Sequence, residues 1–133
     1  MTGRLKVTEK VCPEDWMWFE GQCFFFSERA ANWITSQEYC SQSNGSLAVF
    51  KNKHAMETIK RLSGETEFWF GVRYVGNEWK WPDGSPVTET GIAGTVYQGA
   101  ARGCGVFSAG KFTFDVCTTT RHFMCNKKSP AEY

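Results

Sequence analysis

The 133-residue sequence lacks the short motifs that indicate the common kinds of catalytic site. It contains no Gly-x-Ser-x-Gly, no His-Glu-x-x-His and no phosphate-binding glycine loop. Only two histidines are available as general acids or bases, His54 and His122, and both are expected to pack at the surface or its rim. We therefore expect that the protein is not an enzyme.

The sequence also lacks a basic stripe and a long apolar run. Fifteen Lys and Arg against fourteen Asp and Glu give a net charge of +1, without the clustered positive charge of a nucleic-acid-binding protein. No stretch approaches the roughly 20 apolar residues that cross a bilayer, and the polar residues 1–11 are not a signal peptide. We expect no nucleic-acid partner. A membrane anchor is expected only ahead of residues 1–11, which would then be a polar lead or the remnant of a stalk.

Cysteine is abundant, but no Cys-x-x-Cys pair occurs, which disfavours zinc ribbons and thioredoxin-like redox sites. An even number of cysteines along a chain with 16% aromatic residues is typical of a disulfide framework formed in an oxidising compartment. Spacing alone leaves fifteen possible pairings. The alternative is a zinc site of Cys104, Cys117, His122 and Cys125, although these residues do not form the usual close pairs. The six cysteines are Cys12, Cys23, Cys40, Cys104, Cys117 and Cys125.

The pattern of apolar residues predicts an α+β domain in which two helices flank an antiparallel sheet. Helices are expected over residues 32–45, ending at an Asn-Gly signal, and over residues 52–64. A hairpin that turns at Glu20-Gly21 opens the domain. Residues 85–103 are rich in Gly, Thr, Ala and Ser and are expected to be a long loop, either functional or disordered. Further strands are predicted at 46–50, 67–75, 78–84, 111–117 and 121–125, and Trp69, Trp79 and Trp81 are expected in the core.

Several segments, taken in order, resemble the C-type lectin-like domain. They are CPEDWMWFEGQCFFFSE, NWITSQEYC, SLAVF, FWFGV, WKWPDGSP and the closing GKFTFDVC…HFMC, and they span residues 12–125. Phe70 stands where the family's Trp-Ile-Gly-Leu strand has an aliphatic residue, which is a mild departure. The resemblance implies a C-type lectin-like fold for residues 12–127, followed by a C-terminal tail at 128–133. It also implies three disulfides, Cys12–Cys23, Cys40–Cys125 and Cys104–Cys117.

The sugar-binding branch of that family holds calcium with two triplets of residues, and this sequence has neither. Calcium takes about six to eight oxygen ligands, usually with several carboxylates. Residues 85–103 contain no Glu-Pro-Asn or Gln-Pro-Asp. Phe112, Thr113 and Phe114 occupy the positions of the Trp-Asn-Asp triplet. Asp115 lies one position later, where a strand turns the side chain to its other face. We therefore expect no metal, no cofactor and no calcium-held sugar.

Among lectin-like domains without these triplets, the sequence most resembles the natural-killer-cell receptors and their lectin-like ligands. The resemblance implies the ectodomain of a type II membrane protein at the extracellular face of the plasma membrane, a secreted form, or a viral mimic. It implies a homodimer that binds a protein on a facing cell, such as another lectin-like or an MHC-like protein. The alternatives are a carbohydrate-binding lectin and a venom-type lectin-like protein. The venom type usually has an extra cysteine in the long loop, which residues 85–103 lack.

The long loop and the strands beside it are the expected contact surface, since loops on a rigid scaffold commonly carry binding residues. Aromatic and arginine side chains often anchor such contacts. Asn44 begins an Asn-Gly-Ser sequon that could accept an N-glycan. The predicted partner-binding residues are Arg73, Tyr74, Glu89, Tyr97, Arg102, Lys111 and Thr113.

Overall fold

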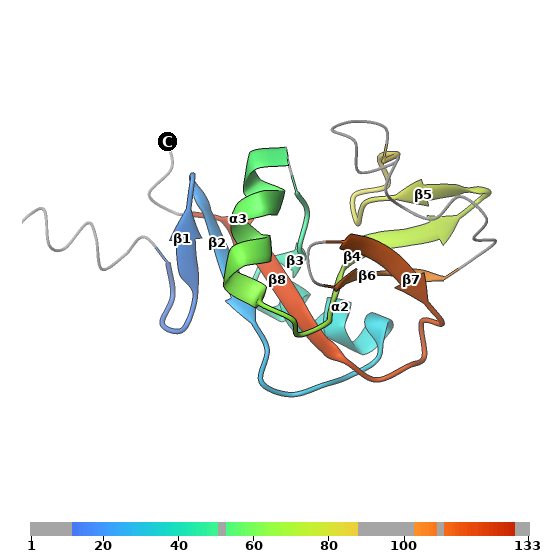
Figure 1. The fold of residues 1–133 in the computed structure, drawn as a ribbon, viewed down its shortest axis with the longest axis horizontal. Coiled ribbons are helices and arrows are strands. Elements are labelled where there is room, and N and C mark those ends of the chain that lie inside the picture. The colour runs from blue at the N-terminus through green and yellow to red at the C-terminus, as the bar shows by residue number, and fades with distance from the viewer. Residues whose placement is uncertain (1–11, 51–52, 88–102, 109–110, 130–133) are drawn as a thin grey trace, which may run out of the picture.

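The structure is a computed structural model that describes residues 12–50, 53–87, 103–108 and 111–129. These residues form two helices and eight strands in an α+β arrangement (Figure 1). No helix among them is long and apolar enough to cross a membrane. The elements are β1 (Met17–Phe19), β2 (Gln22–Phe26), α2 (Trp33–Gln42), β3 (Ser46–Leu47), α3 (Lys53–Ser63), β4 (Phe68–Val75), β5 (Glu78–Lys80), β6 (Cys104–Ser108), β7 (Lys111–Asp115) and β8 (His122–Lys128).

Local sequence signals account for the first hairpin and for the ends of α2. Strands β1 and β2 are joined by Glu20 and Gly21, with φ of 51° and 82°, which are the left-handed angles that a two-residue hairpin turn needs. The Asn32 side chain caps α2 by accepting a hydrogen bond from the Thr35 N–H at 2.8 Å. Asn44, with φ of 67°, follows the last turn of the helix. The predicted hairpin turn and the predicted helix are both confirmed.

The strands form one sheet in the order β1-β2-β8-β4-β6-β7, with β3 paired to β8 and β5 paired to β4. Strand β8 lies in the middle of the molecule, between the N-terminal hairpin and β4 (Figure 1). Its pairing with β4 is parallel and joins Trp69 to Phe123, whereas the other strand pairs are antiparallel. The sheet is therefore mixed and not wholly antiparallel as predicted. Parallel neighbours need a long connection, and the whole segment from β5 to β7 lies between β4 and β8.

Strand β6 was missed by the sequence prediction. Its first four residues, Cys-Gly-Val-Phe, are buried on both faces of the sheet, so the strand has no alternation of polar and apolar residues to detect. The predicted strand at 46–50 is shorter than expected, because only Ser46 and Leu47 pair with β8. Beyond them Ala48 makes single backbone bonds, donating to Met124 and accepting from Gly71.

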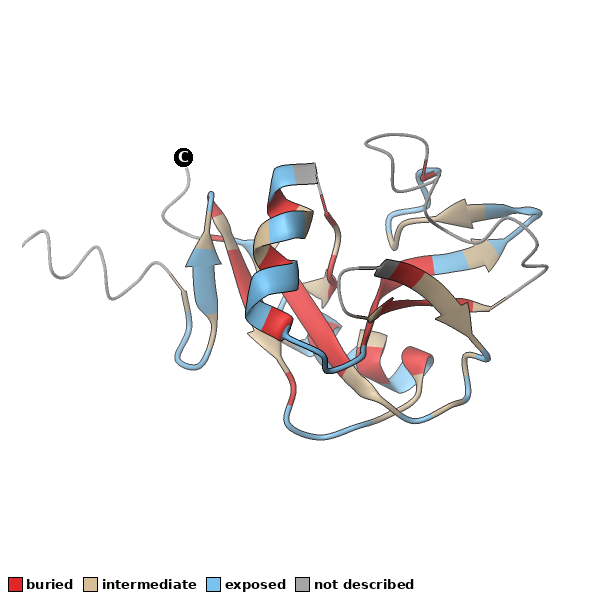
Figure 2. Ribbon diagram, viewed as in Figure 1, coloured by how far each residue is buried: buried red, intermediate tan, exposed pale blue. Residues whose placement is uncertain are grey.

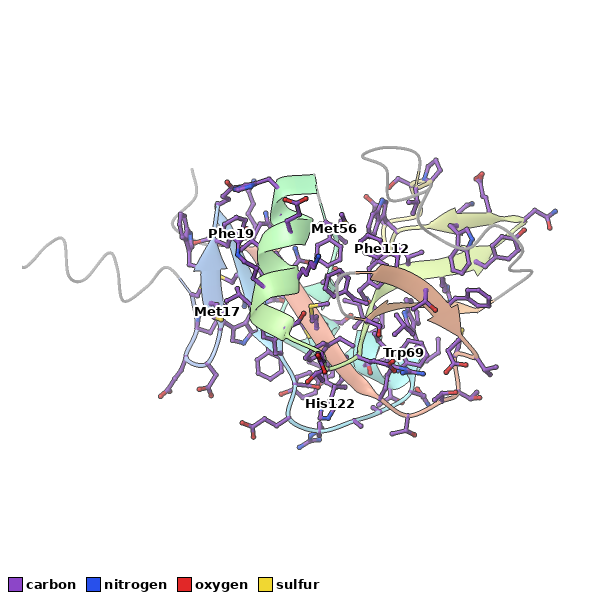
Figure 3. The ribbon with its side chains drawn as sticks, in the orientation of Figure 1. Met17, Phe19, Met56, Trp69, Phe112 and His122 are labelled. Carbon is purple, nitrogen blue, oxygen red and sulfur yellow. A yellow bond between two sulfur atoms is a disulfide. The ribbon has the colours of Figure 1, made fainter. Side chains whose placement is uncertain are left out.

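Buried aromatic side chains pack on both faces of the sheet. Figure 2 shows that the buried residues run along the central strand β8. The alternation along β4 sends Phe70 to the side of α3 and Trp69 to the side of α2. Figure 3 shows Phe112 and Trp69 on opposite sides of β4 and β6. Trp69 is fully buried as predicted, and Trp79 and Trp81 are half-buried against the α3-side cluster. The largest members of that cluster are Phe24, Phe50, Phe68, Phe70, Phe107 and Phe112; the α2-side cluster includes Trp33, Trp69, Val106 and Phe123.

The three disulfides have the pairing that the resemblance implied. They join Cys12 to Cys23, Cys40 to Cys125 and Cys104 to Cys117. The second bridge ties α2 to β8 across 85 positions and closes the longest loop. In the chain-entropy model this bridge stabilises the fold by about 4 to 5 kcal/mol. No cysteine is free, so the alternative zinc site is excluded for these residues.

Candidate partner-binding surface

Two neighbouring residues of the predicted surface, Arg73 and Tyr74, lie on opposite faces of β4. The Arg73 guanidinium lies over the ring of Trp33, with its carbon 5.2 Å from the ring centroid, on the side of α2. The Tyr74 ring lies against Trp79 of β5 at 5.3 Å between centroids. Consecutive residues of a strand point to opposite faces. Arg73 and Tyr74 therefore cannot belong to one flat contact surface.

Tyr74 belongs to a small group of half-buried aromatic residues. Trp79 is its direct partner in the β4–β5 pairing, and the Trp79 ring is 6.3 Å from that of Phe114 on β7. We call Tyr74, Trp79 and Phe114 the aromatic cluster. Three strands contribute to it, and each side chain remains partly exposed. Partly exposed aromatic residues on a rigid sheet are typical anchors of protein contacts.

Sequence reasoning assigned only one member of this cluster to the surface. Trp79 was expected in the core, and Phe114 was considered only as a residue that cannot bind calcium. The register brings them together, since Gly105 pairs with Phe114 and Tyr74 donates its backbone N–H to the Gly103 carbonyl. The relevant signal is cross-strand register, which a single sequence does not contain.

The other predicted residues are placed only in part. Thr113 lies on β7 and pairs with Val106 of β6. The Thr113 side chain is half-buried. Val106 belongs to the α2-side cluster, so Thr113 faces the same side of the sheet as Arg73. The backbone of Lys111 pairs with Ser108 at the start of β7. Glu89, Tyr97 and Arg102 lie outside the described residues.

The residues at the position of the calcium triplet do not fit a calcium ion. Phe112 is buried in the α3-side cluster, and Phe114 belongs to the aromatic cluster. The Thr113 hydroxyl is engaged with the backbone of its neighbour Phe114. Asp115 directs one carboxylate oxygen to the Arg121 guanidinium, and the other accepts the N–H of Val116 at 2.7 Å. One neutral hydroxyl and one engaged carboxylate fall far short of the about six to eight oxygens that calcium takes.

Arg121 is the residue that engages the Asp115 carboxylate. It forms ion pairs with Asp115 of β7 and with Glu67, which precedes β4. Its guanidinium also lies over the Trp69 ring, 5.1 Å from the centroid. Only 16% of the Arg121 side chain is exposed, so these contacts are shielded from solvent more than ordinary surface pairs. Asp115 therefore acts as a structural residue that ties the end of β7 to the start of β8.

The two histidines lie near the surface, as expected. His54 is exposed on α3, and its Nε2 is 3.4 Å from the Glu20 carboxylate. His122 is half-buried at the start of β8, with Nδ1 at 3.2 Å from the Ser27 carbonyl. Asn44 of the sequon is exposed in the turn after α2. Within the described part of the chain, no three His, Cys, Asp or Glu side chains gather as a metal site.

Known proteins share this sequence pattern and this fold. The lectin C-type domain matches residues 29–127. The chain is 27% identical over 123 residues to human C-type lectin domain family 2 member B, covering 91% of this chain. It is 27% identical over 116 residues to human killer cell lectin-like receptor subfamily G member 1, covering 87% of this chain. Among solved structures, the carbohydrate-recognition domain of the mouse scavenger receptor C-type lectin superposes with a TM-score of 0.77 at 24% identity, covering 88% of this chain and 96% of that one.

The matches to curated relatives cover part of those proteins. The chain spans 78% of the first relative's length and 57% of the second's. It spans less than two thirds of several other relatives, with shares of 42%, 52% and 38%. What the whole relatives do therefore does not follow from this domain alone.

Proposed function

This chain belongs to the lectin C-type domain family, and from that premise we propose that it recognises a protein partner without calcium. It would be the extracellular domain of a type II cell-surface receptor or receptor ligand of the natural-killer-cell group. A killer cell lectin-like receptor among its relatives supports this branch. The chemistry of β7, and not the family as such, supports independence from calcium.

The observation that carries the proposal is the occupation of the triplet position by Thr113 and Phe114. A calcium-held sugar needs oxygen ligands there, and this chain has a hydroxyl bonded to its own backbone and an aromatic ring. The Phe114 ring instead extends a half-buried group of aromatic residues with Tyr74 and Trp79. The position that serves sugar binding in one branch thus contributes an apolar contact in this chain.

The proposed contact surface is the aromatic cluster together with the long loop predicted over residues 85–103. A protein contact of standard size buries about 800 Å² on each partner, which exceeds what three side chains provide. We therefore include Lys111, at the start of β7, and the loop residues Glu89, Tyr97 and Arg102. Arg73 and Thr113 face the other side of the sheet and would contact a partner only at its rim.

The partner is proposed to be a protein on a facing cell, of lectin-like or MHC-like type, and the domain is proposed to act as a homodimer. Asn44 is the proposed N-glycan acceptor, since its side chain is exposed. Replacing Ser46 with Ala removes the sequon and keeps Asn44 in its turn. The mass of the protein secreted from mammalian cells would then fall by one glycan.

A cell-surface screen with a fluorescent tetramer of the domain tests the proposal. We expect staining of particular cell types that is unchanged by a calcium chelator and abolished when surface proteins are removed with protease. Staining that disappears with the chelator would contradict calcium independence. Staining that survives protease but is lost after glycosidase treatment would contradict protein recognition.

Calcium-independent glycan binding is the second candidate, because the partly exposed Trp79 ring could stack on a sugar face. A glycan array probed with and without chelator separates the two functions. Selective glycan binding that is lost in a Trp79→Ala variant would favour this candidate over protein recognition.

A further inference from the structure

A groove of about 340 Å³ lies between helix α2 and the strands β4 and β5. Its helical wall carries Ile34 and Glu38, one turn apart, and its strand wall carries Arg73, Val75 and Lys80. The groove lies on the α2 side of the sheet and therefore on the face opposite to the aromatic cluster. Its volume is at the small end of the range for ligand pockets and suits a few side chains.

The Arg73 guanidinium at this groove is positioned by the Trp33 ring on which it stacks. The Trp33 ring beneath the guanidinium is 3% exposed, and its Nε1 donates to the Phe70 carbonyl at 2.9 Å. A fixed indole keeps a stacked guanidinium in one position, so less freedom is lost when a ligand binds. Among the described residues no carboxylate lies within ion-pairing distance of Arg73. Within the described part of the chain, no ion pair competes with a ligand for this guanidinium.

A second cation lies directly across from Arg73. Lys80 is its partner in the antiparallel β4–β5 pairing, and like charges at such positions repel each other. The nearest carboxylate to Lys80 is Glu78 of the same strand, at 4.0 Å. Glu38 adds one negative charge on the helical wall, so two cations face one anion in the groove. An anion bound between Arg73 and Lys80 would relieve the repulsion between them.

The groove also has an apolar border. Ile34 is 47% exposed and Val75 is 39% exposed, which places them among the most exposed large hydrophobic side chains of the described chain. Both line the same groove as the two cations. A ligand that supplied only negative charge would leave these side chains in water. A ligand with an adjoining apolar side chain would cover them and gain the free energy of their burial.

From this combination we propose that the groove binds a segment of a protein partner in which a Glu or Asp residue is followed by an aliphatic residue. The carboxylate accepts hydrogen bonds from Arg73 and Lys80, and the aliphatic side chain packs on Ile34 and Val75. Sulfated glycans fit less well, because they offer no apolar side chain for that border. The contact is separate from the aromatic cluster and does not depend on the function proposed for that cluster.

Nuclear magnetic resonance titration of the nitrogen-15-labelled domain tests the proposal directly. The probe is the blocked peptide Gly-Ser-Gly-Glu-Leu-Gly-Ser-Gly, compared with versions that carry Gln-Leu or Glu-Ser in place of Glu-Leu. We expect the Glu-Leu peptide to shift the amides of Ile34, Glu38 and Arg73 and the indole N–H of Trp33. Each of the other two peptides should bind several-fold more weakly, because one lacks the charge and the other the aliphatic group.

Three substitutions change the charge of the groove in opposite directions. Arg73→Gln and Lys80→Gln should each weaken binding of the Glu-Leu peptide by about tenfold, as expected for loss of a charge-assisted hydrogen bond. Glu38→Gln removes the repelling carboxylate and should strengthen binding by a few-fold. Lys60→Gln, on the exposed surface of α3, is the matched control and should leave binding unchanged. Arg73→Lys keeps the charge and covers the case in which Arg73→Gln does not fold.

Several results would overturn the proposal. Equal shifts with the Glu-Leu and Gln-Leu peptides would remove the role of the carboxylate. Shifts confined to residues outside the groove would move the site elsewhere. Unchanged affinity in Glu38→Gln and Lys80→Gln would remove the charge argument. Heparin fragments that bind through Arg73 and Lys80 while the Glu-Leu peptide does not would identify a sulfated glycan as the ligand instead.

Discussion

The rings of Phe70 and Phe112 lie 4.8 Å apart between centroids, at an interplanar angle of 43°, and both side chains are buried. Phe70 stands where the family pattern has a smaller aliphatic residue, and Phe112 stands where it has a larger tryptophan. The two departures therefore contact each other. We therefore expect the extra volume at Phe70 to compensate for the missing volume at Phe112.

We predict that substitutions toward the family pattern at these positions are coupled. Phe70→Ile alone leaves a void and Phe112→Trp alone crowds the core, and each should lower the free energy of unfolding by about 1 to 3 kcal/mol. The double variant should be more stable than the sum of the single effects by about 1 kcal/mol or more. Urea unfolding of the four proteins measures this cycle. Strictly additive changes in the free energy of unfolding would show that the sizes of the side chains at positions 70 and 112 are not coupled.

Calcium titration should show no stoichiometric binding. Thr113 and Phe114 supply no carboxylate, and the Asp115 carboxylate is bound to Arg121. Isothermal titration calorimetry on the metal-free domain makes the measurement, with a sugar-binding C-type lectin domain measured alongside as a positive control. A saturable heat at one calcium per domain would refute the assignment of β7 as a strand without calcium ligands.

The bridge from Arg121 to Asp115 should stabilise the fold and have no role in metal binding. Asp115→Asn leaves a largely buried guanidinium with one carboxylate fewer and should lower the free energy of unfolding by about 1 to 2 kcal/mol. Glu57→Gln, on the exposed side of α3, is the control and should change stability by less than about 0.5 kcal/mol. Chemical denaturation measures both. If Asp115→Asn is as stable as the unchanged domain, this ion pair does not contribute measurably to the free energy of unfolding.

The three disulfides should differ in their contribution according to the loops that they close. Removing Cys40–Cys125, with 85 positions between its ends, should cost about 4 to 5 kcal/mol in the chain-entropy model. Removing Cys104–Cys117, with 13 positions, should cost about 3 kcal/mol. Paired Cys→Ala variants compared by urea unfolding give the order. A larger loss for the shorter loop would indicate that native packing around Cys104, and not loop entropy, dominates.

Binding to the partner identified by the tetramer screen should depend on the aromatic cluster. Tyr74→Ala and Phe114→Ala should each weaken affinity by at least about fivefold, because aromatic anchors commonly contribute more than about 1 kcal/mol. Alanine variants of Lys111, Tyr97, Arg102 and Glu89 extend the scan into the long loop. Leu62→Ala is the matched control, since Leu62 is 49% exposed on α3. Surface plasmon resonance measures the affinities, and wild-type affinity in all the cluster and loop variants would place the contact elsewhere.

Local signals in the sequence determined much of the fold. The Glu20-Gly21 turn and helix α3 could each be predicted from a short stretch of sequence. The reason is that turn angles and helical periodicity depend on residues close together in the chain. The family pattern supplied the disulfide pairing, which spacing alone left open. The mismatch of Thr113 and Phe114 with calcium ligands was also visible, since it depends only on the chemistry of the residue types.

Tertiary structure alone decided which residues meet. Strand β6 escaped prediction because both of its faces are buried, so its sequence carries no alternation. The strand register placed Arg73 and Tyr74 on opposite faces and brought Trp79 and Phe114 together from distant segments. Register depends on pairing between strands far apart in sequence, and one sequence contains no record of that pairing. The sequence motifs were therefore sufficient to identify the family. The candidate contact surfaces could be identified only from the tertiary structure.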